Sequence, residues 1–314
     1  MTMKSYNNKF IIGVDHGYGN IKTANHCFKT GITAYDTEPL FTKDMLIYNG
    51  KYYLIGEGHK EFLRDKVQDN DYYCLTLVAI AMELSDANIY EADVIIAAGL
   101  PLAWTSGQKQ AFAKYLSQNE DVAFTFRDVD YNIHISDAKI FPQGYSAILP
   151  YTPRMKGLSV MADIGNGTMN MMFLENGRPK AESKMYTEKF GVYQCTLAVR
   201  AAFSKLTQRE IDDFIIDTVL REGTADISKS DLQIITATAQ EYVEGIFRRL
   251  REHGYDAETM RLYICGGGGC LVKHFYSGSL ERVSFIDDIC AAAKGYEALA
   301  EIKLKADESH AKRV

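Results

Sequence analysis

Residues 10–24 read FIIGVDHGYGNIKTA, and residues 160–174 read VMADIGNGTMNMMFL. Each stretch passes from an apolar run through an Asp-x-Gly-x-Gly motif into a second strand-like run, the pattern of a β-hairpin with a glycine-rich tip. The motifs begin at Asp15 and Asp163, 148 residues apart. One such hairpin in each half of the chain, here named hairpin 1 and hairpin 2, predicts two similar lobes that face one another.

The two tips have the chemistry of a phosphate site. We expect Gly17, Gly19, Gly165 and Gly167 to bend with positive φ and to expose backbone N–H groups to phosphate oxygens. An aspartate beside phosphates is repelled unless a divalent cation lies between them, and Mg²⁺ often uses only one or two carboxylates. Lys22 adds an ammonium near the β- or γ-phosphate. The pair predicts a clamp on a nucleoside triphosphate with Mg²⁺; the alternative is two ordinary tight turns.

A third glycine cluster, Gly266 to Gly269, follows an apolar run. It matches neither Gly-Lys-Ser/Thr nor G-x-G-x-x-G, which excludes both phosphate loops. Backbone without side chains, as at Gly266, Gly267 and Gly268, would let an adenine ring lie against it. Glu241 and Glu244 lie three residues apart on a predicted helix, where they could accept hydrogen bonds from ribose or base. The alternatives are a flexible connection and a solvated helix face.

Size, composition and charge limit the function. The chain has 314 residues, 46% of them hydrophobic, which predicts a bilobed globular protein. Its 35 Lys+Arg and 41 Asp+Glu give a formal net charge of −6, so we expect no direct binding to DNA. No stretch of about 20 apolar residues and no apolar signal core is evident, so we expect no membrane segment and a cytoplasmic location.

Other local patterns predict individual elements. The Asn49-Gly50 pair predicts a type I′ hairpin turn, and Thr207 to Glu210 fits a capping box that starts a helix ending near Gly223. Periodicity predicts helices over 72–84 and 230–254, a buried strand over 92–100, and a last helix ending at Ala300 before a frayed tail.

Five segments, in order, resemble the superfamily of actin, sugar kinases and heat-shock chaperone ATPases. They are a first phosphate hairpin (GVDHGYGNIKTA), a connecting-helix start (FPQGYSAIL), a second phosphate hairpin (MADIGNGTMNMMFL), an adenosine loop (YICGGGGCLVKHF) and a final connecting helix (ICAAAKGYEALA). All five lie within residues 11–300, nearly the whole chain. DHGYGNIK and AAKGYEALA are most similar to the ParM/StbA group of bacterial actin-like plasmid-segregation proteins.

The resemblance implies an α/β, actin-like ATPase fold with two RNase H-like lobes around a central nucleotide cleft. The first lobe would comprise residues 1–155, completed by the C-terminal helix at 286–314. The second would comprise residues 156–285.

The resemblance also implies residue roles. Asp15 and Asp163 would hold Mg²⁺ through its water shell, Lys22 would contact phosphates, and Gln143, just inside a helix opened by Pro142, would position the attacking water. The phosphates would be wrapped by Gly17, Tyr18, Gly19, Asn20, Gly165, Asn166, Gly167 and Thr168. Two positions depart from relatives, because many of them carry an acid at Asn170 and polymer-forming ones often carry a carboxylate at Gln143.

By resemblance, the leading function is an ATP- or GTP-hydrolysing protein that forms helical filaments and segregates plasmid DNA through a small DNA-bound adaptor of the ParR kind. The main alternative is a sugar or small-acid kinase, which needs a catalytic Asp beside the acceptor hydroxyl; we find no clear candidate. A chaperone-type ATPase would need a substrate-binding domain after the final helix. A non-hydrolysing interaction module is a further alternative.

Overall fold

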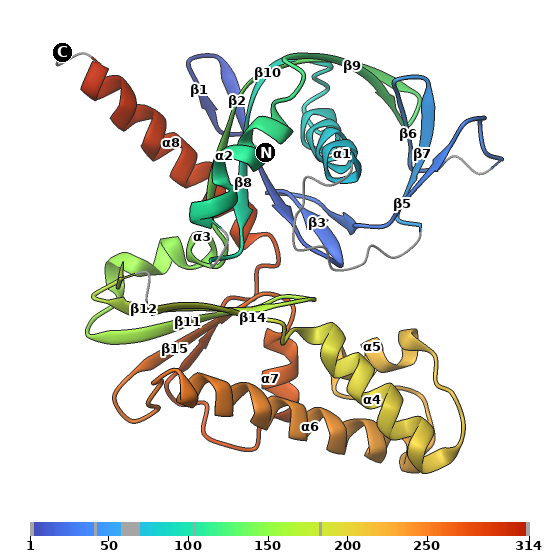
Figure 1. Ribbon diagram of the computed structural model, residues 1–314, viewed down its shortest axis with the longest axis vertical. Helices are drawn as coiled ribbons and strands as arrows, with labels where there is room; N and C mark the ends of the chain where they lie inside the picture. Colours follow the sequence, from blue (N-terminus) through green and yellow to red (C-terminus); the bar gives the residue numbers. More distant parts are fainter. Residues whose placement is uncertain (1–2, 41–42, 58–69, 103–104, 182–183, 312–314) are drawn as a thin grey trace. The chain divides into compact units, whose positions relative to one another are not determined.

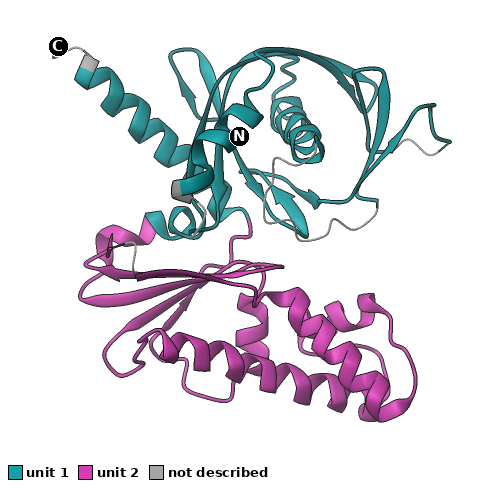
Figure 2. Ribbon diagram, viewed as in Figure 1, with its two compact units in different colours: residues 1–149, 290–314 teal, residues 150–289 magenta. Residues whose placement is uncertain are grey.

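A computed structural model describes residues 3–40, 43–57, 70–102, 105–181 and 184–311. The chain forms two compact units (Figure 2). Unit 1 comprises residues 1–149 and 290–314, and unit 2 comprises residues 150–289. The resemblance instead implies boundaries after residues 155 and 285, which differ from these by 155 − 149 = 6 and 289 − 285 = 4 residues.

Unit 1 contains, in its described residues, a ten-stranded sheet with the order β4-β3-β2-β8-β10-β9-β6-β7-β5, to which β1 adds by pairing with β2. β2, β8 and β10 run parallel at its centre. The last seven residues of β8 are all buried, as expected for a parallel strand covered on both faces. The strands are β1 (Ser5–Tyr6), β2 (Lys9–His16), β3 (Asn20–Lys22), β4 (Cys27–Lys29), β5 (Ile32–Tyr35), β6 (Met45–Tyr48), β7 (Lys51–Ile55), β8 (Glu91–Leu100), β9 (Asp121–Phe126) and β10 (Val129–Pro142).

Four helices of the described residues accompany this sheet: α1 (Asp71–Ser85), α2 (Thr105–Leu116), α3 (Tyr145–Ile148) and α8 (Ala291–Ala311). α1 lies inside the curve of β9, β6 and β7 (Figure 1), where almost every side chain is buried. The predicted helix at 72–84, strand at 92–100 and Asn49-Gly50 turn are confirmed; both turn residues have positive φ, 51° and 72°.

The frayed tail predicted after Ala300 is wrong for residues 301–311, which continue α8; residues 312–314 lie outside the described residues. Contacts with the N-terminal strand explain the helix. Lys4 Nζ lies 2.9 Å from Glu301 Oε2, and the Tyr6 hydroxyl donates to the carbonyl of Leu304 at 3.3 Å and to Glu308. The partners in these contacts are 297, 298 and 302 residues apart in the chain, so no local sequence pattern predicts them.

One turn of α8 packs closely on the parallel strands. A Cβ at Gly13 of β2 would overlap the carbonyl oxygen of Ala293, and a Cβ at Gly99 of β8 would overlap the Tyr296 ring. Glu297, only 7% exposed, accepts a hydrogen bond from the Gly13 N–H at 3.1 Å. Glycine is therefore needed at both strand positions for α8 to sit at this depth.

Burial of Glu297 predicts a pH-dependent stability. Desolvation raises its pKa from the ordinary 4.5 to about 7. The folded chain therefore retains a proton that the unfolded chain has released, so this group's contribution to the free energy of unfolding falls as pH rises from 4.5 to 7 and is constant above. The total decrease in this contribution between pH 4.5 and pH 7 is about 3 kcal/mol. Glu297→Gln should gain that much over the wild type between pH 4.5 and pH 8 in urea unfolding; equal pH profiles would contradict this.

Unit 2 contains, in its described residues, a six-stranded sheet with the order β13-β12-β11-β15-β16, and β14 pairs with β12. Its core joins this sheet to α4, α5, α6 and α7. The elements are β11 (Leu158–Ile164), β12 (Met169–Glu175), β13 (Arg178–Pro179), β14 (Met185–Glu188), α4 (Val192–Thr207), α5 (Asp213–Glu222), α6 (Lys229–Glu252), β15 (Arg261–Cys265), α7 (Gly269–Phe275) and β16 (Val283–Phe285).

The helix predicted over 230–254 is confirmed as α6, but the capping box at Thr207 is wrong. Thr207 is the last residue of α4, and its hydroxyl donates to the carbonyl of Phe203 at 2.8 Å. The N-cap of α5 is Asp212, whose carboxylate accepts from the Phe214 N–H. In the described part of the chain, no helix is both long enough and apolar enough to cross a membrane.

Candidate functional site

Hairpin 1 brings three of the predicted residues together at one edge of the sheet. β2 and β3 pair antiparallel with Asp15 opposite Lys22. Lys22 Nζ lies 3.3 Å from Asp15 Oδ2, and Gln143 Nε2 lies 3.5 Å from Asp15 Oδ1. Asp15 and Gln143 are each 8% exposed. A carboxylate, an ammonium and a neutral amide thus converge where the parallel strands β2 and β10 end, the usual ligand-binding edge of such sheets.

The position of Gln143 differs from the prediction. It does not lie inside a helix but in a turn between β10 and α3, before the N-cap Gly144, which has φ of 83°. Its backbone N–H donates to the carbonyl of Leu100 at the end of β8, at 2.8 Å. The turn is therefore fixed to the neighbouring strand, which holds the Gln143 side chain beside Asp15.

The backbone conformation of the hairpin tips differs from the positive φ that the sequence predicts for their glycines. Among the described residues, none of the four motif glycines of the two hairpins has a positive φ. At Gly17 the requirement is space, since a Cβ would lie 2.5 Å from the Asn20 carbonyl oxygen. Thr30, which sequence reasoning missed, fastens the tip: its hydroxyl donates to Gly17 O at 2.8 Å and its N–H to Gly19 O at 3.1 Å.

Tyr18 is buried at 7% exposure, and desolvation raises its phenol pKa. Its side chain is therefore part of the packing of the tip.

Hairpin 2 is formed by β11 and β12, with Asp163 opposite Asn170. The Gly165 N–H donates to Thr168 O at 2.8 Å and closes the tip. Asn170 is 2% exposed and accepts a hydrogen bond from the Thr187 hydroxyl of β14 at 2.8 Å. The amide at position 170, where the resemblance implies an acid in many relatives, therefore makes a hydrogen bond within the sheet.

The glycine cluster packs directly against hairpin 2. A Cβ at Gly266, whose φ is 81°, would lie 2.5 Å from Ile164 O and 2.7 Å from Asp163 Oδ1. The Gly268 N–H donates to Ile164 O at 2.9 Å. At Gly267, in contrast, an added Cβ would meet open space. Two of the glycines therefore serve close packing behind Asp163, so the cluster is a fixed turn rather than a flexible connection.

The two glutamates proposed for the nucleoside are exposed on α6. Glu244 accepts a hydrogen bond from the Ser277 hydroxyl at 2.8 Å. Ser277 follows the C-terminal end of α7, whereas the glycine cluster lies at its N-terminal end, about 10 Å away along the helix. The structure thus brings Asp163 and the glycine cluster together but places Glu244 at the opposite end of α7.

Hairpin 2 is also fixed by a residue that the sequence did not single out. Gly191 precedes α4, and a Cβ there would lie 2.6 Å from Gly165 O. The next two N–H groups of the chain donate to Gly165 O and Asn166 O at 3.0 and 2.9 Å, and the Tyr242 hydroxyl donates to Gly191 O at 2.8 Å. The start of α4 and the middle of α6 therefore hold the tip.

The donor set fits magnesium better than a transition metal. Among the residues that the structure describes, no group of three or more His, Cys, Asp or Glu side chains could hold a metal ion. Each hairpin instead offers a single carboxylate, Asp15 or Asp163. Mg²⁺ commonly completes its octahedron with water and substrate phosphates, so isolated carboxylates suit it.

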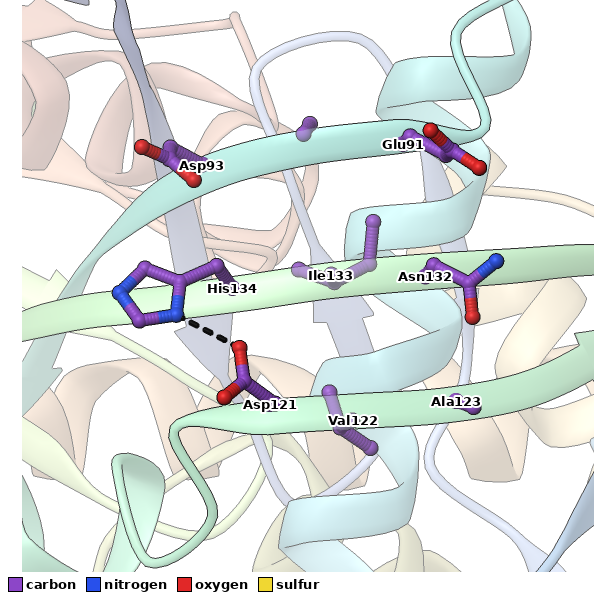
Figure 3. A pocket seen from close by; sticks show the side chains of 9 residues that line it. Glu91, Asp93, Asp121, Val122, Ala123, Asn132, Ile133 and His134 are labelled. Carbon is purple, nitrogen blue, oxygen red and sulfur yellow. Dashed lines mark hydrogen bonds and ion pairs between the residues drawn. The ribbon is translucent and has the colours of Figure 1, made fainter.

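A separate hollow of about 630 Å³ lies on the outer face of β8, β9 and β10 (Figure 3). Glu91, Asp93 and Asp121 line it, and His134 Nδ1 lies 2.8 Å from Asp121 Oδ1. That hydrogen bond raises the pKa of His134. The hollow contains none of the predicted site residues.

Comparisons with known proteins agree with this architecture. Residues 13–145 match the family described as actin like proteins, N terminal domain. No curated protein matches the chain.

Among solved structures, the actin-like protein Alp7A has a TM-score of 0.74 at 15% identity, over 96% of this chain and 99% of that one. A 15-stranded ParM filament from Clostridium botulinum has a TM-score of 0.71 at 19% identity, over 94% and 99%. An archaeal actin homolog in complex with ADP has a TM-score of 0.69 at 19% identity, over 93% and 99%. The chain therefore has the actin-like fold predicted from its motifs.

Proposed function

We propose that the chain is a nucleotide-hydrolysing protein that assembles into filaments and segregates plasmid DNA through a DNA-bound adaptor. The observation that carries this proposal is the convergence of Asp15, Lys22 and Gln143 at the edge of unit 1 where β2 and β10 end. The second Asp-x-Gly-x-Gly hairpin supports it, because Asp163 repeats the acidic position in unit 2.

In this proposal both hairpins bind one nucleoside triphosphate, ATP or GTP. Lys22 would neutralise phosphate charge, and Asp15 and Asp163 would hold Mg²⁺ through its waters; when bound, the ion supplies positive charge beside the phosphates. The backbone N–H groups of the tips would contact phosphate oxygens. Gln143, a neutral amide, is too weak a base to take a proton, but it can orient a water for in-line attack on the γ-phosphate.

Self-assembly is supported by the fold, because this chain spans almost the whole length of a ParM that forms a filament. A head-to-tail contact that does not close gives an open filament of the kind that can move cargo. The formal charge of −6 favours an indirect link to DNA, through a basic adaptor of the ParR kind.

The test of assembly is light scattering and pelleting of micromolar protein with Mg²⁺ and ATP or GTP. We expect scattering to rise with at least one triphosphate and to remain at baseline with EDTA. Protein that stays monomeric with both nucleotides over a range of salt and crowding conditions would refute filament formation.

Gln143→Ala should slow phosphate release about tenfold, the scale of one lost hydrogen bond to the reacting water. Nucleotide-driven assembly should persist, because the phosphate contacts of the tips remain. Gln233→Ala, on the exposed face of α6, is the matched control and should hydrolyse at the wild-type rate. Unchanged hydrolysis in Gln143→Ala would remove the water-orienting role.

A further inference from the structure

The edge of β2 that carries hairpin 1 has a gap between two strand partners. N–H groups of alternate residues of a strand face the same edge, here those of Ile11, Gly13 and Asp15. The Ile11 N–H donates to the carbonyl of Lys4 beside β1 at 2.9 Å, and Asp15 pairs with Lys22 of β3. Between them, the Gly13 N–H donates to Glu297 Oε1 of α8 at 3.1 Å. A buried carboxyl thus takes the place of a strand two residues before Asp15.

A second buried carboxylate holds the other end of the hairpin. Glu83 of α1 is 2% exposed; its Oε1 accepts from the Asn25 N–H at 2.8 Å and its Oε2 from Asn25 Nδ2 at 2.7 Å. Asn25 lies in the turn just after Lys22, and Thr23 and His26 close this turn with two hydrogen bonds of 2.9 and 3.0 Å. Glu83 therefore fixes the chain three residues beyond Lys22.

Both acids are buried, and each accepts a hydrogen bond from a backbone N–H of hairpin 1 or of the turn that follows it. The charged groups that act on Glu297 are Glu83 from α1, Lys4 from the N-terminal segment and Lys294 on α8 itself. Burying a carboxyl costs free energy unless it makes good hydrogen bonds. Because two such acids hold the two sides of one short hairpin, we infer that their role is to fix the position of the hairpin.

We propose that Glu83 and Glu297 are positioning residues for the polyphosphate. They hold the two sides of hairpin 1, so that Asp15 and Lys22 keep their spacing before the ligand binds. This inference rests on the proposed nucleotide site and adds two residues to it. Preorganisation of this kind increases affinity because no ordering cost remains to be met on binding.

The role of Glu297 can be separated from its size and charge with two variants. Glu297→Gln keeps an oxygen acceptor for the Gly13 N–H, whereas Glu297→Met has similar length but no acceptor. We expect the Gln variant to bind ATP as the wild type does and the Met variant to bind about tenfold more weakly. Asp307→Asn, further along α8, removes an exposed carboxylate and should change nothing.

The role of Glu83 can be tested by exchanging the two partners. Asn25→Asp places a carboxylate against Glu83 and should weaken ATP binding at least about tenfold through like-charge repulsion. Adding Glu83→Gln restores a donor–acceptor pair, because the introduced amide can donate to the introduced carboxylate, and should restore affinity. Glu83→Gln alone should be nearly silent, because the Asn25 amide can rotate to accept.

The decisive readout is the ratio of affinities for ATP and adenosine, measured by calorimetry on protein shown to be folded by circular dichroism. A displaced hairpin weakens binding of ATP but not of adenosine, whereas general loss of structure lowers both. ATP affinity equal to wild type in Glu297→Met and Asn25→Asp, or a ratio that does not change, would overturn the positioning role. Failure of the wild type itself to bind any nucleoside triphosphate would instead refute the proposed function.

Discussion

Asp163→Asn should weaken binding of the magnesium complex of ATP by about 100-fold, because it removes the negative charge that we propose holds the ion and keeps the shape of the side chain. The fold should persist, since Asp163 is the last residue but one of β11 and its backbone pairing with Asn170 is unchanged. Asp163→Ala should bind no more tightly than the Asn variant. The measurement is nucleotide affinity by fluorescence or calorimetry, with Mg²⁺ and with EDTA.

Two controls make this result specific. Glu175→Ala removes an exposed carboxylate from the far end of hairpin 2 and should bind like the wild type. In EDTA, the wild type and Asp163→Asn should bind equally weakly, because the carboxylate then has no ion to hold. Wild-type affinity in Asp163→Asn with Mg²⁺ present would exclude Asp163 from the site.

A double-mutant cycle with Asp15→Asn tests whether the two hairpins hold one ion. If Asp15 and Asp163 serve the same Mg²⁺, the second substitution should add little to the first, because the ion is already lost. Two separate sites would give additive losses. The cycle therefore tests, from binding free energies alone, whether Asp15 and Asp163 hold the same ion.

The parts of the fold that sequence predicted are those that depend on neighbours in the chain. Hairpin 1, hairpin 2 and the Asn49-Gly50 turn each join segments a few residues apart, so alternation and turn chemistry suffice to find them. The same holds for α1 and α6, whose apolar positions repeat within each helix.

The parts that sequence missed depend on distant partners. Glu83 and Glu297 contact residues 58 and 284 positions away, and no local pattern marks an acid as buried. The capping prediction at Thr207 is wrong because a threonine at the end of one helix gives the same local sequence pattern as the N-cap of the next helix. The sequence predicts that Gly266 gives a flat surface for a base. In the structure, glycine is needed there because the carbonyl oxygen of Ile164 occupies the space that a Cβ would take.

The close approach of α8 to the sheet leads to the second large effect. Gly13→Ala should lower the free energy of unfolding by about 3 kcal/mol. The new Cβ would overlap the carbonyl oxygen of Ala293 and lie 2.9 Å from Glu297 Cγ. Because the overlapping atom is helix backbone, no rotamer change can relieve the contact, and α8 must move away from β2.

That movement is opposed by the rest of the same helix turn. Tyr296, fully buried, occupies the space that a side chain at Gly99 would need, and Gly295 packs against the backbone of Ser146. A retreat of α8 would therefore open its apolar contacts with Ile11 and Phe141 as well as the Glu297 hydrogen bond. The cost should exceed the 0.4–1 kcal/mol or so that alanine gains over glycine by restricting the unfolded chain.

Gly107→Ala is the matched control, because Gly107 is exposed in α2 and an added Cβ would meet open space. It should stabilise the protein by up to about 1 kcal/mol through helix propensity. Urea unfolding of both variants should therefore give opposite signs for the same chemical change. A Gly13→Ala protein as stable as the wild type would mean that α8 can withdraw from β2 at little cost, and then Glu297 could not hold the strand that carries Asp15.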